Sequence, residues 1–216
     1  MQTEFARVQM ITQQIRAWDV LDERVLDAMR RTPREFFVPE RFAGLAFADA
    51  GIPLRAGQHM LAPKVVGRLL QALDAQPGMR ALVVGAGTGF VAACLSAMGA
   101  SVRAIELHAE LAASARANLK RAGFGQVEVI TGDTFNLDMG RDYAVIAVCG
   151  ALPLYDERFA RALALGGKLF VVTGDRLPQE ALLVTRTGED KWDSSGLFET
   201  AIDALENAPV PEPFQF

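Results

Sequence analysis

The chain has 216 residues, of which 50% are hydrophobic and 22% are charged, and its formal net charge is −4 at pH 7. This composition supplies a large core and excludes a disordered chain, and the negative charge disfavours a protein that binds the phosphate backbone of nucleic acids. Two cysteines, Cys94 and Cys149, are too few for a disulfide framework or a zinc site, so we expect two buried thiols and no metal. The N-terminus has no signal-peptide pattern and no apolar run is long enough for a bilayer, so we expect a soluble cytoplasmic protein without membrane contact.

The first part of the chain predicts helices followed by an irregular segment. Apolar residues at helical spacing predict two helices within residues 3–33. In the first of them, Phe5, Val8, Ile11 and Ile15 fall at helical spacing. Asp22 is the expected N-cap of the second helix, and Pro33 is its expected end. An extended apolar segment is expected over residues 34–39, and loops over residues 40–62.

From Pro63 onward the pattern is that of an α/β protein. Pro63 is expected to open a helix whose buried stripe is Val65, Val66, Leu69, Leu70 and Leu73. Strands are then expected at 80–84, 101–106, 126–131, 143–149 and 168–173, and helices at 90–98, 108–122 and 155–164. This alternation predicts a parallel sheet with helices on both faces. Residues 180–187 and 192–203 predict an antiparallel hairpin at the edge of that sheet.

Three closely spaced glycines, Gly85, Gly87 and Gly89, follow the first strand of the predicted sheet. A dinucleotide-binding fingerprint has the spacing Gly-x-Gly-x-x-Gly, but the sixth position here is Phe90. The spacing Gly-x-Gly-x-Gly is typical of methyltransferases of this fold, which bind S-adenosylmethionine, and it disfavours a dehydrogenase. Glu106 closes the next strand, where an acid is placed to accept hydrogen bonds from both hydroxyls of a ribose.

The expected fold is therefore a Rossmann-like, S-adenosylmethionine-dependent methyltransferase fold, with a mostly parallel sheet and a C-terminal antiparallel edge hairpin. We assign this core to residues 63–216 and an N-terminal helical extension with a substrate loop to residues 1–62, all within a single domain. Asp133 and Thr134 follow the third strand of the sheet. The Asp133 carboxylate is placed to accept a hydrogen bond from an adenine amino group, or else to cap a turn.

The sequence resembles the protein-L-isoaspartate O-methyltransferase family over nearly its whole length. The resemblance is carried by Pro-Arg-Glu-Phe-Phe-Val-Pro at 33–39, by Gly57-Gln58 leading to Pro63, and by the segments 25–29, 45–49, 52–54 and 164–169. It implies S-adenosylmethionine as the methyl donor and an isoaspartyl carboxylate in a damaged protein or peptide as the acceptor. Carried over by position, the cofactor-binding residues are Gly85, Gly87, Thr88, Gly89, Glu106, Leu107, Asp133 and Thr134.

Three positions depart from the pattern of the family that the chain resembles. The family usually has Thr-Ile-Ser after Gly-Gln, with its serine at the active site, and this chain has His59-Met60-Leu61. Val83 stands where the family usually has an acid, and Ala144 where it usually has an aspartate. A leucine at position 61 offers no hydroxyl to the acceptor, so these departures bear on the acceptor more than on the fold.

Methyl transfer to a carboxylate needs alignment and removal of water rather than a general base, because a carboxylate is ionised at pH 7. We therefore assign the catalytic positions to Gln58, which orients the acceptor, and His59, which donates a hydrogen bond to a carboxylate. For His59 the alternative is a loop histidine bonded to a nearby carbonyl. The loop of Cys149 is expected to line the pocket, without a nucleophilic role for the thiol.

Two other functions stay open on the sequence alone. The first is a methyltransferase of the same fold that acts on another acceptor, such as a small-molecule carboxylate or hydroxyl. The second is a non-catalytic module that binds the cofactor or a partner protein.

Overall fold

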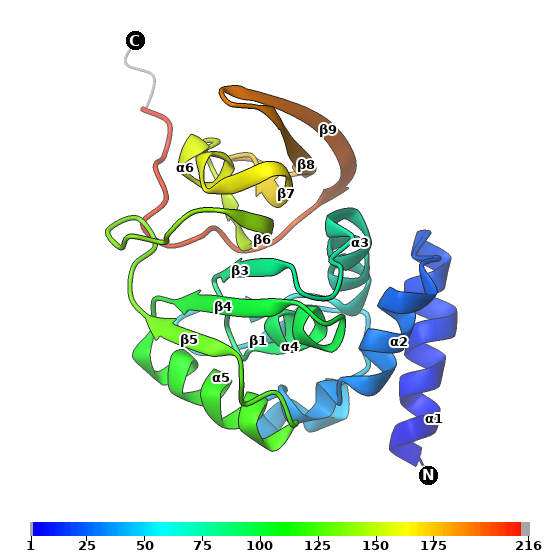
Figure 1. Cartoon of the computed structure of the whole chain (residues 1–216). Coiled ribbons are helices and arrows are strands. Elements are labelled where there is room, and N and C mark those ends of the chain that lie inside the picture. Colours follow the sequence, from blue (N-terminus) through cyan, green and yellow to red (C-terminus); the bar gives the residue numbers. More distant parts are fainter. Residues whose placement is uncertain (1, 213–216) are drawn as a thin grey trace.

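The computed structural model describes residues 2–212 and contains a seven-stranded sheet in the order β5-β4-β3-β6-β7-β8-β9 (Figure 1). The strands are β3 (Arg80–Val84), β4 (Ser101–Glu106), β5 (Glu128–Thr131), β6 (Tyr143–Leu152), β7 (Leu163–Thr173), β8 (Gln179–Gly188) and β9 (Lys191–Thr200). The first five strands in this order pair in parallel, and β8 and β9 add antiparallel at one edge. The expected Rossmann-like sheet with its edge hairpin is confirmed.

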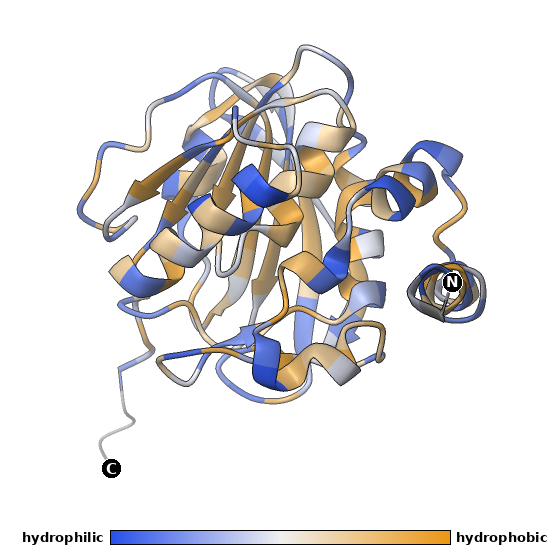
Figure 2. Ribbon diagram, turned by 90° about the horizontal axis from the view of Figure 1, so that it is seen from below, coloured by the Kyte–Doolittle hydropathy of each residue, from blue (hydrophilic) through white to orange (hydrophobic). Residues whose placement is uncertain are grey.

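The sheet is apolar on both faces, because alternate residues of the interior strand β3 belong to different hydrophobic clusters. Ala81 and Val83 belong to a cluster with residues of the helices α3 (Pro63–Leu73), α4 (Phe90–Ala97) and α5 (Ala109–Arg121). Leu82 and Val84 belong to a second cluster with residues of α6 (Glu157–Arg161). Figure 2 shows the hydrophobic strands enclosed between these helices. A strand buried on both faces is the expected environment for parallel pairing.

The N-terminal extension is helical, as expected, but its first turns are not buried. It consists of α1 (Gln2–Gln9), a π-helical turn at Met10–Ile15, a 3₁₀ turn at Arg16–Trp18 and α2 (Glu23–Arg31). Asp22 caps α2 by accepting a hydrogen bond from the backbone of Arg24 at 2.8 Å, which confirms its predicted role. Of the apolar residues at helical spacing in the first predicted helix, Ile11 and Ile15 are buried, whereas Phe5, at 64% exposure, and Val8 are exposed. The π-helical turn and α2 pack on the core, and α1 lies at the edge of the molecule (Figure 2).

The extended segment predicted over residues 34–39 is also wrong, because Arg34–Phe36 form a 3₁₀ turn. A three-residue repeat places Arg34 and Phe37 on the same side, and both side chains are fully buried. After a further 3₁₀ segment at Glu40–Leu45, the chain forms a two-residue antiparallel pair, β1 (Ile52–Pro53) with β2 (His59–Met60). This short pair holds the predicted substrate loop.

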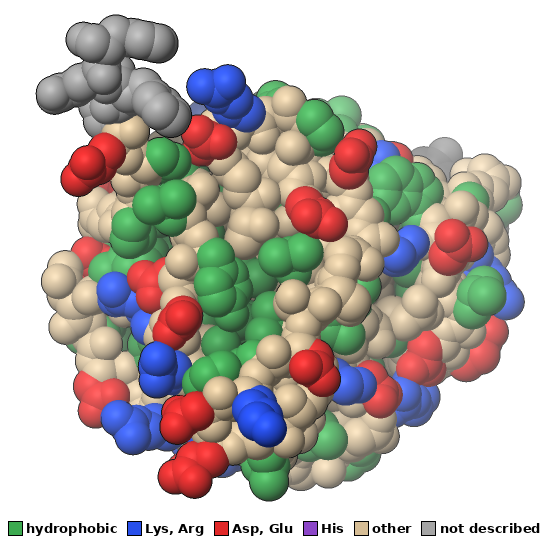
Figure 3. Space-filling view, turned by 90° about the horizontal axis from the view of Figure 1, so that it is seen from above, with side chains coloured by type: hydrophobic (Ala, Val, Ile, Leu, Met, Phe, Trp, Pro, Cys, Tyr) green, Lys and Arg blue, Asp and Glu red, His purple; other side chains and the backbone are tan. Residues whose placement is uncertain are grey.

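The helix predicted over residues 155–164 is reduced to α6, since β7 begins at Leu163. A register shift in the pairing with β6 between Tyr143 and Val145 accommodates the Gly166-Gly167 stretch within the strand, with Gly166 at a φ of 77°. Figure 3 looks onto the side of α6 and the β8–β9 hairpin, where hydrophobic side chains gather between scattered charges. A cavity of about 270 Å³ between these elements is lined by Tyr155, Leu182, Val184 and Trp192, among others.

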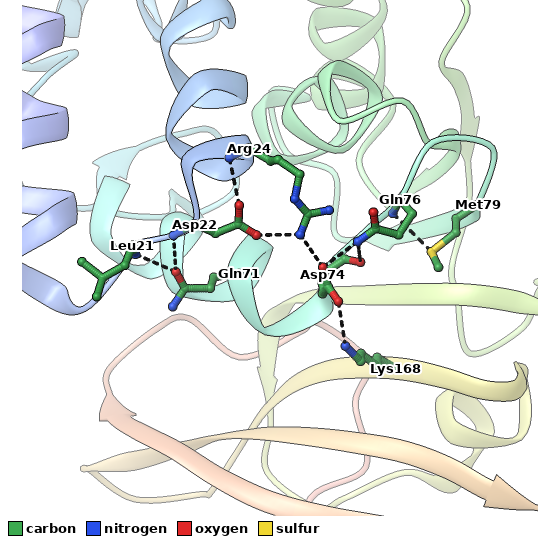
Figure 4. Close-up of polar contacts among 8 residues, drawn as sticks. All are labelled: Leu21, Asp22, Arg24, Gln71, Asp74, Gln76, Met79 and Lys168. Atoms are coloured by element: carbon green, nitrogen blue, oxygen red, sulfur yellow. Dashed lines mark hydrogen bonds and ion pairs between the residues drawn. The ribbon is translucent and has the colours of Figure 1, made fainter.

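A polar cluster fastens the extension to the core (Figure 4). Arg24 of α2 donates hydrogen bonds to Asp22 at 2.7 Å and to Asp74 at 2.6 Å. Asp74 follows α3 in the left-handed conformation and also contacts Lys168 of β7 at 3.4 Å. Gln71 of α3 accepts from the backbone N–H of Asp22 at 3.0 Å. Asp74 therefore joins α2, α3 and β7 at one point.

We expect Asp74→Asn to lower stability at neutral pH and to have less effect in acid. The hydrogen bond from Arg24 holds the pKa of the Asp74 carboxyl below its ordinary value. A depressed folded-state pKa contributes stability above the unfolded-state pKa, and this contribution is lost as the pH falls through the folded-state value. The side chain is 43% exposed, so the loss at pH 7 should stay below about 1 kcal/mol. Urea unfolding of the wild type and of Asp74→Asn at pH 7 and near pH 3 measures this loss. An equal difference in the free energy of unfolding at the two pH values would contradict a stabilising role of the Asp74 carboxylate.

Candidate functional site

One cavity lies at the carboxyl ends of β3, β4 and β6, where the chain continues to opposite sides of the sheet. Neighbours β4 and β6 flank β3, so this is the switch point at which open α/β sheets bind ligands. Six of the eight residues predicted to bind the cofactor line this cavity: Gly85, Gly87, Glu106, Leu107, Asp133 and Thr134. The two residues assigned as catalytic, Gln58 and His59, line it as well.

Glu106 connects the glycine loop to the start of α5. Its side chain is buried, at 4% exposure, and accepts hydrogen bonds from the backbone N–H of Gly87 at 2.7 Å and of His108 at 3.0 Å. Gly85 and Gly87 have φ values of 72° and 55°, in the region that glycine adopts without strain. The loop thus turns its backbone toward the Glu106 carboxylate and keeps the cavity floor free of side chains.

Thr88 and Gly89 do not line the cavity. A Cβ on Gly89 would lie 3.2 Å from Cγ of Leu119, so this glycine serves the close packing of the loop against α5. Thr88 is buried, and its backbone carbonyl accepts a hydrogen bond from the Asn118 side chain of α5 at 3.2 Å. Thr88 and Gly89 therefore attach the loop to α5 on the side that faces away from the cavity.

Asp133 caps a turn and also lines the cavity. One carboxylate oxygen accepts from the backbone N–H of Phe135 at 2.8 Å. The other accepts from the side chains of Asn136 at 2.7 Å and Asn207 at 3.0 Å. A carboxylate has about four acceptor positions, so these contacts leave capacity for a further donor.

The segment after β9 forms a wall of the cavity that the sequence did not indicate. Leu205 and Glu206 line the cavity, and Glu206 forms an ion pair with Nε2 of His108 at 3.0 Å. The backbone of this segment pairs with the end of β6, where Leu205 donates to the carbonyl of Ala151 at 2.8 Å. With this wall in place the cavity measures about 60 Å³.

A second, larger cavity of about 690 Å³ adjoins the first, and the two share Gln58, His59 and Cys149. At this junction Nδ1 of His59 lies 2.9 Å from a carboxylate oxygen of Asp203, which follows β9. Farther along the same cavity, Lys64 forms an ion pair with Asp49 at 2.8 Å. The histidine therefore contacts a carboxylate side chain, not the backbone carbonyl that the alternative interpretation expected.

Arg34 supports the substrate loop from inside the protein. Its fully buried guanidinium donates to the backbone carbonyls of Ala46 and Leu61, both at 2.9 Å, and lies 4.7 Å from the ring centre of Phe90, the first residue of α4. Burial without a carboxylate partner lowers the pKa of Arg34 to about 10. Arg34 thus links the residue at the family's serine position to the helix that follows the glycine loop.

Both cysteines are free thiols. Cys94 is buried, as expected, whereas Cys149 is only half-buried, because it faces the junction of the two cavities. Desolvation, together with a smaller effect of the nearby Glu106 carboxylate, raises the pKa of the Cys149 thiol to about 12. A thiol with this pKa stays protonated at neutral pH and is a poor nucleophile.

Comparison with known proteins identifies similar proteins over nearly the whole chain. The family model described as protein-L-isoaspartate(D-aspartate) O-methyltransferase (PCMT) matches residues 6–201. A protein-L-isoaspartate O-methyltransferase of Methylorubrum populi is 40% identical over 89% of this chain and 91% of its own length. One of Aeropyrum pernix is 39% identical over 86% of this chain and 74% of its own length.

A solved structure from Plasmodium falciparum, described as a beta-aspartate methyltransferase (PCMT) in complex with S-adenosyl-L-homocysteine, has the same fold. Its TM-score is 0.80 at 19% identity, with 93% of this chain and 98% of that chain covered. Among residues 2–212, no helix has the length and hydropathy needed to cross a membrane.

Proposed function

This chain belongs to the protein-L-isoaspartate O-methyltransferase family, and on that premise we propose that it methylates the free carboxylate of L-isoaspartyl residues in damaged proteins or peptides. The observation that carries the proposal is the junction of two cavities. The smaller cavity is lined by the glycine loop and Glu106, the larger one has a volume of about 690 Å³, and both are lined by His59. An acceptor in the larger cavity can therefore approach a donor in the smaller one.

The residues of the smaller cavity fit S-adenosylmethionine, which supplies a methyl group on a positively charged sulfur. Glu106 offers a buried carboxylate that a ribose hydroxyl can share with the backbone of the loop. Asp133 and Thr134 offer acceptors in the same cavity, where we place the adenine. Gly85 and Gly87, at positive φ, present backbone without a side chain to the cavity, and Leu107 is part of its lining.

Gln58 and His59 hold the acceptor in this proposal. When its ring carries both protons, His59 can donate Nδ1–H to Asp203 and Nε2–H to the acceptor carboxylate. The Gln58 amide lies at the same junction and fixes a second acceptor atom. Leu61 is buried and supplies an apolar surface that excludes water. Alignment and desolvation are the main needs of an ionised nucleophile, and alignment alone is worth up to roughly 7–11 kcal/mol.

The test compares an isoaspartyl peptide with its normal aspartyl twin as acceptors of labelled methyl from S-adenosylmethionine. We expect base-labile label on the isoaspartyl peptide and little on the aspartyl peptide. Only in the isoaspartyl peptide does the backbone continue through the side-chain carbonyl and leave the α-carboxylate free. Calorimetry with S-adenosylhomocysteine on the same preparation controls for an intact cofactor site. Equal labelling of both peptides, or none by protein that binds S-adenosylhomocysteine, would refute the proposal.

We also propose that the protein acts in the cytoplasm. Its two cysteines are free thiols, which a reducing compartment preserves.

A further inference from the structure

The junction of the two cavities holds a histidine–carboxylate pair whose capacity to act as a base is not needed for carboxyl methylation. An isoaspartyl carboxylate is already ionised at neutral pH, so its methylation requires no proton acceptor. A histidine whose ring is oriented by a carboxylate is, however, the common arrangement of a general base. The pair therefore has a chemical capacity that the proposed function leaves unused.

The geometry of the pair is that of an oriented base. His59 lies on the short strand β2, and its Nδ1 is 2.9 Å from the carboxylate of Asp203. Asp203 is itself fixed, because its backbone carbonyl accepts a hydrogen bond from Ala151 at the end of β6 at 2.8 Å. Within residues 2–212 no group forms a hydrogen bond with Nε2 of His59. Donation of Nδ1–H to Asp203 leaves the lone pair of a neutral imidazole on this Nε2.

The larger cavity can accommodate a neutral aromatic acceptor. The apolar part of its wall includes Trp18, Met60, Leu61, Val65, Leu177 and Ile202. Besides the pair itself, its charged side chains are Asp49, Lys64 and Glu199, so negative charge outnumbers positive and Lys64 is already paired with Asp49. The volume of about 690 Å³ falls within the range of small-molecule sites and admits one or two aromatic rings.

We propose that His59, oriented by Asp203, is a general base that enables this protein to methylate the hydroxyl of a phenol. A phenol is the hydroxyl acceptor that matches the pair, because its proton, with a pKa of about 10, is within reach of an imidazole, whereas an alkyl hydroxyl is far less acidic. The activity shares the methyl donor with the proposed function but not its acceptor. Leu61, at the family's serine position, then provides an apolar contact for the aromatic ring.

The transfer balances without any further reactant. The phenol oxygen attacks the methyl carbon while its proton passes to Nε2 of His59, and the carbon–sulfur bond breaks with both electrons on sulfur. The products are the methyl ether, S-adenosylhomocysteine and an imidazolium that Asp203 stabilises. The imidazolium then returns its proton to water.

Two phenols of different acidity test the base directly. 4-Methylphenol is protonated at neutral pH and needs a base, whereas 4-nitrophenol ionises near neutral pH and needs little help. We expect His59→Gln to lower methyl transfer to 4-methylphenol by 10²–10⁴-fold and transfer to 4-nitrophenol by less than about tenfold. Asp203→Asn is expected to lower the ratio of the rate with 4-methylphenol to the rate with 4-nitrophenol as well, because asparagine does not fix the tautomer of His59. The ratio within one variant does not depend on the folded fraction, and Glu110→Gln, outside both cavities, is the matched control.

A binding measurement gives a readout apart from turnover. With S-adenosylhomocysteine present, slightly below the pH at which free 4-nitrophenol ionises, wild-type protein should raise the visible absorbance of the phenolate and His59→Gln should not. Failure to methylate 4-methylphenol and 2-naphthol, or an unchanged ratio in His59→Gln, would overturn the inference. Labelling of the isoaspartyl peptide by the same preparation decides the proposed function separately.

Discussion

Replacement of Glu106 by alanine is expected to weaken the binding of S-adenosylhomocysteine by roughly 10- to 150-fold, or about 1.5–3 kcal/mol, the range for hydrogen bonds to a charged group. The carboxylate accepts from the backbone of Gly87 and of His108, so its removal costs both the ribose contact and the order of the loop. The buried position strengthens both effects, since water replaces a lost partner poorly in a desolvated site.

Titration calorimetry measures the affinity of Glu106→Ala for S-adenosylhomocysteine, and two further variants serve as comparisons. Glu106→Gln keeps the size of the side chain and one acceptor, so we expect an intermediate loss. Glu110→Ala removes an acid from the first turn of α5 that is 71% exposed and outside the cavity, and its affinity should match that of the wild type. Normal affinity of a folded Glu106→Ala protein would show that the sugar is not held here.

Replacement of Arg34 by methionine is expected to lower the free energy of unfolding by about 2–6 kcal/mol. The substitution nearly preserves volume and removes a buried cation, but it leaves the carbonyls of Ala46 and Leu61 without their donor. Each buried polar group that loses its partner costs about 1–3 kcal/mol. The stacking contact with Phe90 is lost as well.

Chemical unfolding measures this effect, and Arg30→Met is the matched control. Arg30 lies on α2 in an exposed ion pair with Asp27, so its loss should cost at most about 1 kcal/mol. Because Arg34 holds the backbone of Leu61, residual folded Arg34→Met protein should also have a higher KM for the methyl acceptor. Equal stability of the two variants would show that the buried guanidinium contributes nothing.

The parts of the fold that the sequence predicted are those with strong local signals. The strand from Arg80 to Val84 contains the continuous apolar run Ala81–Val84, and the helix that begins at Pro63 has a regular buried stripe. Both were placed correctly, because a short apolar run marks a strand buried on both faces and burial at helical spacing marks a helix with one buried face. The first helix is an exception, since Phe5 lies at helical spacing with the buried residues but is itself exposed. Periodicity identifies a face and does not show whether anything covers it.

The smaller cavity likewise combines residues that the sequence predicted with residues that it did not. The glycines and Glu106 lie at ends of adjacent parallel strands, so their position at one edge of the sheet followed from the order of elements. Asp203, Leu205 and Glu206 follow the last strand in a segment without a periodic pattern, and the sequence offered no signal for their contacts. His59 was a candidate from its position after Gly-Gln, but its partner was not predictable.

By itself, the sequence determined the parallel sheet, the loop at its switch point and the family, because each depends on local spacing along the chain. Tertiary structure alone decided that Asp203 meets His59, that Arg34 holds Leu61, and that the segment after β9 narrows the smaller cavity. These contacts join residues far apart in the chain, and their energy depends on distances that only the packed sheet and its helices set.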